Sequence, residues 1–145
     1  MTRILRFFLA LAVSVAAIAT SASAQAPTSG APPAGPTELF RTALPDMPGK
    51  QLVVVALTIQ PKRADQPAAA GHRHPGSVYV YVTEGTARFG VEGEPVKVVK
   101  TGESFFEAPG ALHNVMESAS ATEGAKAIAV MIVPDGAPLT LPAQP

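Results

Sequence analysis

The sequence predicts an all-β protein with one folded domain, built as a sandwich or a barrel. After about residue 50, apolar residues occur in short runs rich in Val, Ile, Phe and Tyr. Turn dipeptides such as Glu-Gly and Pro-Gly separate these runs, and no window of twelve residues beyond the N-terminal segment has a helical period. A length of 145 residues is also typical of a single domain.

Seven short apolar runs are predicted to be strands, because each is bounded by turn residues. They are 52–59, 78–83, 86–91, 96–99, 104–107, 112–117 and 127–133. Most of the connections are tight, so the strands should be mainly antiparallel. Ahead of the first run, Glu38 to Leu44 could form a short helix or an irregular arm. Within 78–83 the valines alternate with Tyr79 and Tyr81, which should place the tyrosines on the outer face.

The first 24 residues have the three-part layout of a secretory signal peptide. Arg3 and Arg6 precede an apolar run from Phe7 to Ala19, and small residues ending at Ala24 follow as the cleavage site. The run is shorter than the roughly 20 residues that a membrane span needs, although an uncleaved anchor is the alternative. We therefore expect a periplasmic or secreted protein with no membrane contact after cleavage. Residues 25–37 are predicted to be a flexible Pro/Ala/Gly linker, 38–141 the folded domain and 142–145 a tail.

Composition excludes several classes of function. The chain has no cysteine, so it can form no disulfide and offers no thiolate as a nucleophile or metal ligand. Removal of the two signal-peptide arginines from eleven basic residues leaves nine against eleven acidic ones, a net charge of about −2. With no basic patch and no interleaved aromatic residues, a nucleic acid is not expected as a partner.

The three histidines are the main candidate for a functional site. His72 and His74 are two residues apart, so on an extended strand both would point to one face, about 7 Å apart along the backbone. His113 follows the Pro109-Gly110 turn and could lie beside them if its strand returns next to theirs. Three neutral imidazoles on one side of a divalent ion would leave open coordination positions, as a catalytic metal requires.

At these residues the chain resembles the cupin superfamily. The first cupin motif, G(x)5HxH(x)3–4E(x)6G, aligns with His72 and His74, with Gly85 in the closing position. The second, G(x)5PxG(x)2H(x)3N, aligns with Gly102, Gly110 and His113. The resemblance covers roughly residues 50 to 134. It implies a double-stranded β-helix, or jelly-roll barrel, with His72, His74 and His113 as metal ligands.

The chain departs from both motifs. Val78 stands where the metal-binding glutamate is expected, and Glu117 stands at the asparagine position. Some cupins, including thiol dioxygenases, use three histidines alone, so the resemblance still implies a bound divalent transition metal (Fe, Mn, Ni, Cu or Zn). A neutral set of ligands would leave more positive charge on the ion and would attract anionic substrates more strongly.

Glu107 is the candidate catalytic residue. It precedes the turn that presents His113, and if it shares an inward face with Phe105 it could be a fourth ligand or a proton carrier. The simpler interpretation, which residue type alone favours, is a strand-end carboxylate that faces solvent. The aromatic residues Phe105 or Phe106 could line an apolar pocket around the metal.

Three functions remain open from the sequence. The first is an exported metal-dependent cupin enzyme, a dioxygenase or isomerase acting on a small organic substrate. The second is a non-catalytic module that binds or senses a small molecule or a metal, since fold does not determine function. The third is a β-domain whose histidines bind no metal. Cupins are often homodimers, and the apolar run 52–59 is a candidate exposed edge for pairing.

Overall fold

The fold consists of two five-stranded antiparallel sheets, and no helix occurs in the part of the chain that the structure describes. The computed structural model describes residues 35–65 and 70–144. The predicted signal peptide and most of the predicted linker lie outside these residues. Within them, no helix is long and apolar enough to cross a membrane. The all-β prediction is confirmed.

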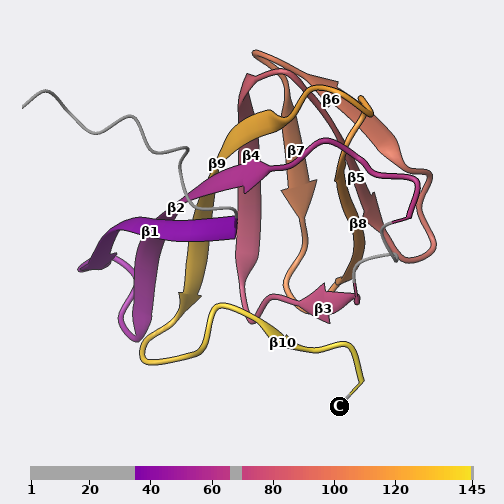
Figure 1. The fold of residues 1–145 in the computed structure, drawn as a ribbon. Helices are drawn as coiled ribbons and strands as arrows, with labels where there is room; N and C mark the ends of the chain where they lie inside the picture. Colours follow the sequence, from indigo (N-terminus) through magenta and orange to yellow (C-terminus); the bar gives the residue numbers. More distant parts are fainter. Residues whose placement is uncertain (1–34, 66–69, 145) are drawn as a thin grey trace, which may run out of the picture. The chain divides into compact units, whose positions relative to one another are not determined.

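The first sheet has the strand order β1-β2-β9-β4-β7 (Figure 1). Its members are β1 (Gly35–Ala43), β2 (Lys50–Ile59), β4 (Ser77–Glu84), β7 (Ser104–Glu107) and β9 (Ala125–Pro134). β9 pairs with β2 over ten residues on one side and with β4 on the other. This long central strand is the apolar run predicted at 127–133.

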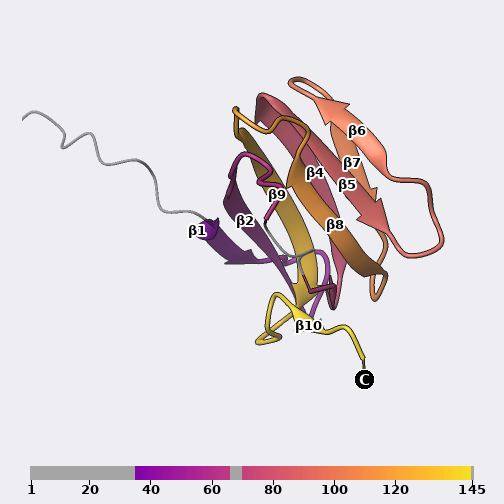
Figure 2. The ribbon, with the colours of Figure 1, turned by 45° about the vertical axis from the view of Figure 1, so that its right-hand side comes forward.

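The second sheet has the order β10-β3-β8-β5-β6 and lies on the other side of the core (Figure 2). Its members are β3 (His72–Arg73), β5 (Thr86–Val91), β6 (Lys97–Lys100), β8 (Leu112–Ser118) and β10 (Leu141–Pro142). The short strand β3 pairs with β8, and β10 pairs with the free side of β3. The C-terminal segment is therefore joined to the sheet that carries the histidines.

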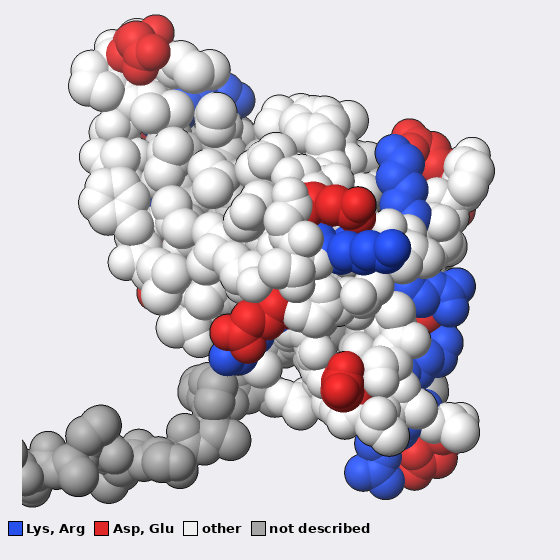
Figure 3. Space-filling view, turned by 90° about the horizontal axis from the view of Figure 1, so that it is seen from above, with Lys and Arg blue, Asp and Glu red and all other residues white. Residues whose placement is uncertain are grey.

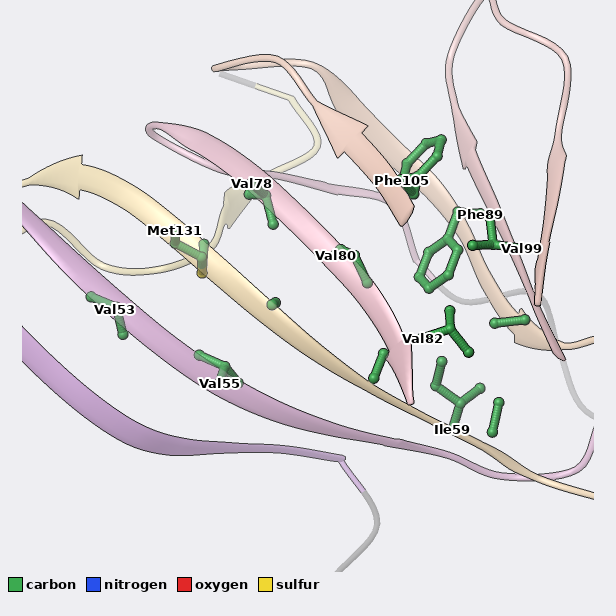
Figure 4. Close-up of a cluster of buried hydrophobic side chains, with 14 of the residues drawn as sticks. Val53, Val55, Ile59, Val78, Val80, Val82, Phe89, Val99, Phe105 and Met131 are labelled. Atoms are coloured by element: carbon green, nitrogen blue, oxygen red, sulfur yellow. The ribbon is translucent and has the colours of Figure 1, made fainter. Parts of the chain in front are cut away.

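Alternating apolar residues from both sheets form the core (Figure 4). In β4 the valines are buried, whereas Tyr79 and Tyr81 are exposed, as the sequence predicts. From the second sheet Phe89 is fully buried, and its ring stacks on Phe105 with 5.3 Å between centroids. Since Phe106 is 57% exposed, only Phe105 of the two predicted phenylalanines packs inside.

Three local predictions are wrong. The stretch from Glu38 is neither helix nor irregular arm but part of β1, which begins at Gly35 and so includes the last residues assigned to the linker. β1 pairs with β2 along almost its whole length, which places the run 52–59 in the interior of the sheet and not at an edge. The predicted tail 142–145 begins inside β10, because Pro142 pairs with His72 of β3.

Charged side chains on the surface are mixed in sign. Figure 3 shows acidic and basic side chains interspersed on the face seen from above. Several of them form ion pairs, such as Lys126 with Glu84 at 2.9 Å and Lys62 with Glu117 at 3.0 Å. The pairing of Glu117 with Lys62 and Arg88 places this residue away from the histidines, in a surface ion-pair group.

Candidate metal centre

The three histidines come together at one end of the second sheet. Because β3 pairs with β8 in the register that sets His72 opposite His113, residues 41 positions apart become direct neighbours. The ring centroids of these two side chains are 5.2 Å apart. One ligand atom from each of His72, His74 and His113 lies within 4.8 Å of the other two. The convergence expected from the sequence is therefore present in the fold.

His74 lies just after β3, and the C-terminal segment fixes its ring. Its Nδ1–H donates a hydrogen bond to the Leu139 carbonyl at 2.6 Å, since a carbonyl oxygen can only accept. The other ring nitrogen, Nε2, therefore carries no hydrogen, and it lies 3.1 Å from Nε2 of His72, within hydrogen-bond distance. A hydrogen bond from one ring nitrogen that leaves the other free is the usual arrangement of a metal-binding histidine.

His113 is held in the opposite tautomer by its own strand. Its Nε2–H donates to the Val115 carbonyl at 2.7 Å, which leaves Nδ1 without a hydrogen. This Nδ1 is buried and has no hydrogen-bond partner. The Phe89 ring lies 6.2 Å from the imidazole and limits its movement on the core side. The free lone pair of His113 thus faces the other two histidines.

Glu107 faces the histidines and not solvent. It is 2% exposed and lies on the inward face of β7 together with Phe105. Its Oε1 is 3.5 Å from Nδ1 of His113, and its Oε2 is 3.7 Å from Nε2 of His74. Both distances are too long for good hydrogen bonds, and Oε2 has no other partner. The solvent-facing interpretation favoured by residue type is therefore wrong, because the alternation of β7 turns this carboxyl inward.

Burial shifts the pKa of the three histidines and of Glu107. It lowers the pKa of His72 and His74, and it lowers the pKa of His113 to about 4. It raises the pKa of Glu107 to about 7, because an ionised carboxylate is poorly solvated there. At neutral pH the three imidazoles are thus uncharged, which is the form that binds metal ions.

These residues fit a bound divalent metal. Ligand nitrogens about 2.1 Å from one ion, with bond angles of about 90–109°, lie about 3.0–3.4 Å from each other. The 3.1 Å between the Nε2 atoms of His72 and His74 falls in this range. Within residues 35–65 and 70–144, the two buried side-chain polar atoms without partners are Glu107 Oε2 and His113 Nδ1, and both belong to this cluster. Buried polar atoms normally have partners, so their presence here indicates a ligand.

Two sets of contacts that support the site have no signal in the sequence. The carbonyls of Leu139 and Val115 set the histidine tautomers, but any residue supplies a carbonyl. Arg73, between the two histidines, donates to the carbonyls of Gly110 and Ala143 at 2.7 and 3.0 Å. It thereby ties the turn before His113 and the C-terminal segment to β3. Only the tertiary structure assigns these roles.

A surface hollow of about 280 Å³ lies at the other end of the sheet. Its lining includes Ile59, Pro61 and Lys126 but none of the four site residues. The residues of β2 and β9 that line the hollow are about six positions along these strands from the part that lies beside Val78 and Glu107. That separation is roughly 20 Å. We do not assign the chemistry to this hollow, because its titratable side chains, Glu84 and Lys126, are exposed and pair with each other.

The buried carboxyl should make the stability of the metal-free protein depend on pH. Because the folded-state pKa of Glu107 is raised from 4.5 to about 7, its stabilising effect is complete below about pH 4.5 and is lost as pH rises through 7. Compared with Glu107→Gln, the wild type should therefore lose on the order of 3 kcal/mol of unfolding free energy over this range. The lowered pKa of His113 changes the unfolding free energy with pH in the opposite direction, but it does so in both the wild type and Glu107→Gln. Urea unfolding from pH 4.5 to 8 measures the difference, and parallel curves would contradict it.

Residues 57–131, more than half of the chain, match the cupin domain family. The fold and the histidine cluster define the class of protein, a β-barrel with a candidate metal site, and the family match names the family within that class. The chain belongs to the cupin family. Among curated proteins, none matches its sequence.

Solved structures with the same fold are distant in sequence. An uncharacterized conserved protein with a double-stranded beta-helix domain from Klebsiella pneumoniae is 22% identical, with a TM-score of 0.54, over 74% of this chain and 84% of that one. DMSP lyase DddQ from Ruegeria pomeroyi is 18% identical, with a TM-score of 0.52, over 63% and 42%. An oxalate decarboxylase is 20% identical, with a TM-score of 0.50, over 63% and 23%. The chain spans less than half the length of the two enzymes, and these similarities show the fold alone.

Proposed function

We propose that this chain is a small exported cupin that binds one divalent transition metal through His72, His74 and His113. The proposed reaction class is dioxygenase or isomerase chemistry on a small organic substrate. Export is proposed from the signal-peptide pattern of residues 1–24, which favours the periplasm or the extracellular space. Named enzymes among the solved cupin structures, a DMSP lyase and an oxalate decarboxylase, support small molecules as the class of substrate.

One observation carries the metal proposal: three imidazoles converge so that one ligand nitrogen of each lies within 4.8 Å of the other two. The hydrogen bonds to Leu139 and Val115 leave Nε2 of His74 and Nδ1 of His113 without a hydrogen, so that each has a lone pair for a metal ion. Nothing in the core requires three desolvated imidazoles to approach so closely, and burial of polar atoms without partners is costly. A metal ion satisfies these atoms together.

The site residues have distinct roles in this proposal. A bound ion would supply Lewis-acid chemistry, or redox chemistry if it is Fe, Mn or Cu. The histidines hold it, and the hydrophobic wall of Phe89 and Phe105 excludes water behind them. Glu107 is the buried carboxyl that faces the three histidines, as a fourth ligand or as a proton carrier.

The second candidate function is a non-catalytic metal-binding or sensing cupin. The observation that favours it is the low exposure of the site, since the side chains of His74 and His113 are 11% and 3% exposed. A site of this kind leaves little room for an organic substrate. Oxygen uptake with Fe²⁺ and a panel of thiol, phenolic and carboxylate compounds separates the two functions. Uptake with any compound supports an enzyme, and its absence across the panel supports the binding module.

Metal analysis of protein purified without a histidine tag tests the proposal itself. We expect about one equivalent of a first-row transition metal, removable by a chelator and restored by the free ion. A protein that takes up none of Mn²⁺, Fe²⁺, Ni²⁺, Cu²⁺ or Zn²⁺ would overturn it.

Removal of residues 137–145 is expected to weaken metal binding by about 10- to 100-fold. The deletion eliminates the Leu139 carbonyl that orients His74 and the Ala143 carbonyl that binds Arg73. Competition with a chromogenic chelator measures the affinity for Zn²⁺. A deletion of only residues 144 and 145 is the control, since both carbonyls remain. Equal affinity of the two truncated chains would show that the C-terminal segment does not support the site.

A further inference from the structure

The missing cupin glutamate has a counterpart in this fold on the neighbouring strand. Val78, at the position of the expected glutamate, lies on β4 directly opposite Glu107 on β7. Directly opposed residues of an antiparallel pair have Cβ atoms about 4.5–5.5 Å apart and point to the same face. Both side chains are 2% exposed. The valine and the glutamate thus occupy the same layer of the interior, one strand apart.

We propose that Glu107 is the fourth protein ligand of the metal and replaces the carboxylate that the cupin motif places at residue 78. This inference rests on the proposed metal site. The carboxylate oxygens lie 3.5 Å from Nδ1 of His113 and 3.7 Å from Nε2 of His74. Two ligand atoms about 2.1 Å from one ion lie roughly 3 to 4 Å apart for most coordination angles. Both distances are therefore those expected between ligands of a shared ion.

The apolar character of Val78 supports this assignment. With glutamates at both positions, two carboxylates would be buried side by side, and their mutual repulsion would disfavour ionisation of both. With Val78 and Glu107, one carboxylate remains in the interior, and Oε2 has no protein partner to compete for it. The net charge of the ligand set is then the same as in the three-histidine, one-glutamate site that the cupin motif describes.

A reciprocal exchange of the two side chains tests the assignment. Glu107→Val should lower the affinity for Zn²⁺ and Mn²⁺ at least about 10-fold, and Glu107→Gln should lower it as well, because the charge is lost. The double variant Val78→Glu/Glu107→Val should recover affinity to within a few-fold of the wild type. Glu103→Gln, a change at an exposed carboxyl, is the control. Chelator competition gives the affinities, and circular dichroism confirms that each variant is folded.

The outcomes separate this proposal from the metal site itself. Wild-type affinity in Glu107→Val and Glu107→Gln would overturn the role of Glu107 while leaving the three-histidine site intact. A double variant that fails to recover would overturn the equivalence of the two positions. A wild type without metal would instead overturn the proposed function. If Glu107→Val does not fold, Glu107→Gln carries the test, since it preserves the shape of the side chain.

Discussion

Replacement of His113 by alanine is expected to lower the affinity for a divalent transition metal by more than about 100-fold. Loss of a residue that only orients a ligand typically costs 10- to 100-fold, so loss of a direct ligand should cost more. The buried Nδ1 of His113 has no protein partner, and no other described side chain is placed to supply a nitrogen there. Metal content after purification and the dissociation constant for Zn²⁺ measure the effect.

His74→Ala should behave in the same way, because its Nε2 lies 3.1 Å from that of His72 and shares the proposed ion. Asn114→Ala is the matched control for His113, since Asn114 is its exposed neighbour in β8. Folding of each variant is checked by thermal unfolding without metal. If both histidine variants keep wild-type metal content, these residues are not the ligands.

Gly76→Ala is expected to destabilise the fold by at least about 3 kcal/mol. A Cβ atom at this position would lie 1.9 Å from the carbonyl oxygen of Ile132 and 2.9 Å from Cα of Val133. Both are backbone atoms of β9, the central strand of its sheet, so neither can move without breaking the pairing of β9 with β2 and β4. Gly76 also connects His74 to β4, so a shift there would displace the metal site.

Urea unfolding of the metal-free protein measures this destabilisation. Gly93→Ala is the control, because its φ is +82° but nothing lies within 4 Å of the added Cβ. That substitution should cost only the roughly 1–2 kcal/mol of a left-handed backbone. If Gly76→Ala costs no more than Gly93→Ala, the approach of residue 76 to β9 does not limit the fold.

The strand pattern and most strand boundaries were predictable from the sequence. The runs at 78–83, 86–91, 104–107 and 112–117 match strands to within one residue at each end. Each of them is apolar, short and bounded by turn residues, so local pattern and tertiary pairing agree. β1 was missed because its residues are exposed and polar in part. It forms a strand only because β2 offers it a free edge, and that edge is a property of the fold.

The candidate site was predictable in part, because some of its features are local in the sequence. The spacing of His72 and His74, the turn before His113 and the cupin motifs are local features, and they identified three residues that the fold brings together. The inward direction of Glu107 was not predicted, because residue type favours solvent for a carboxylate and a strand of four residues gives too little alternation to decide between two faces.

The sequence by itself determined the all-β class, the strand order along the chain and the identity of the three histidines, since each depends on residue type and short-range spacing. Only the tertiary structure decided which ring nitrogens of His74 and His113 carry no hydrogen. Carbonyls from Leu139 and Val115 fix the tautomers. It also decided that Glu107 faces them, opposite the valine that replaces the cupin glutamate. These facts depend on register between strands, and register is set by packing of the whole sheet, which no local pattern encodes.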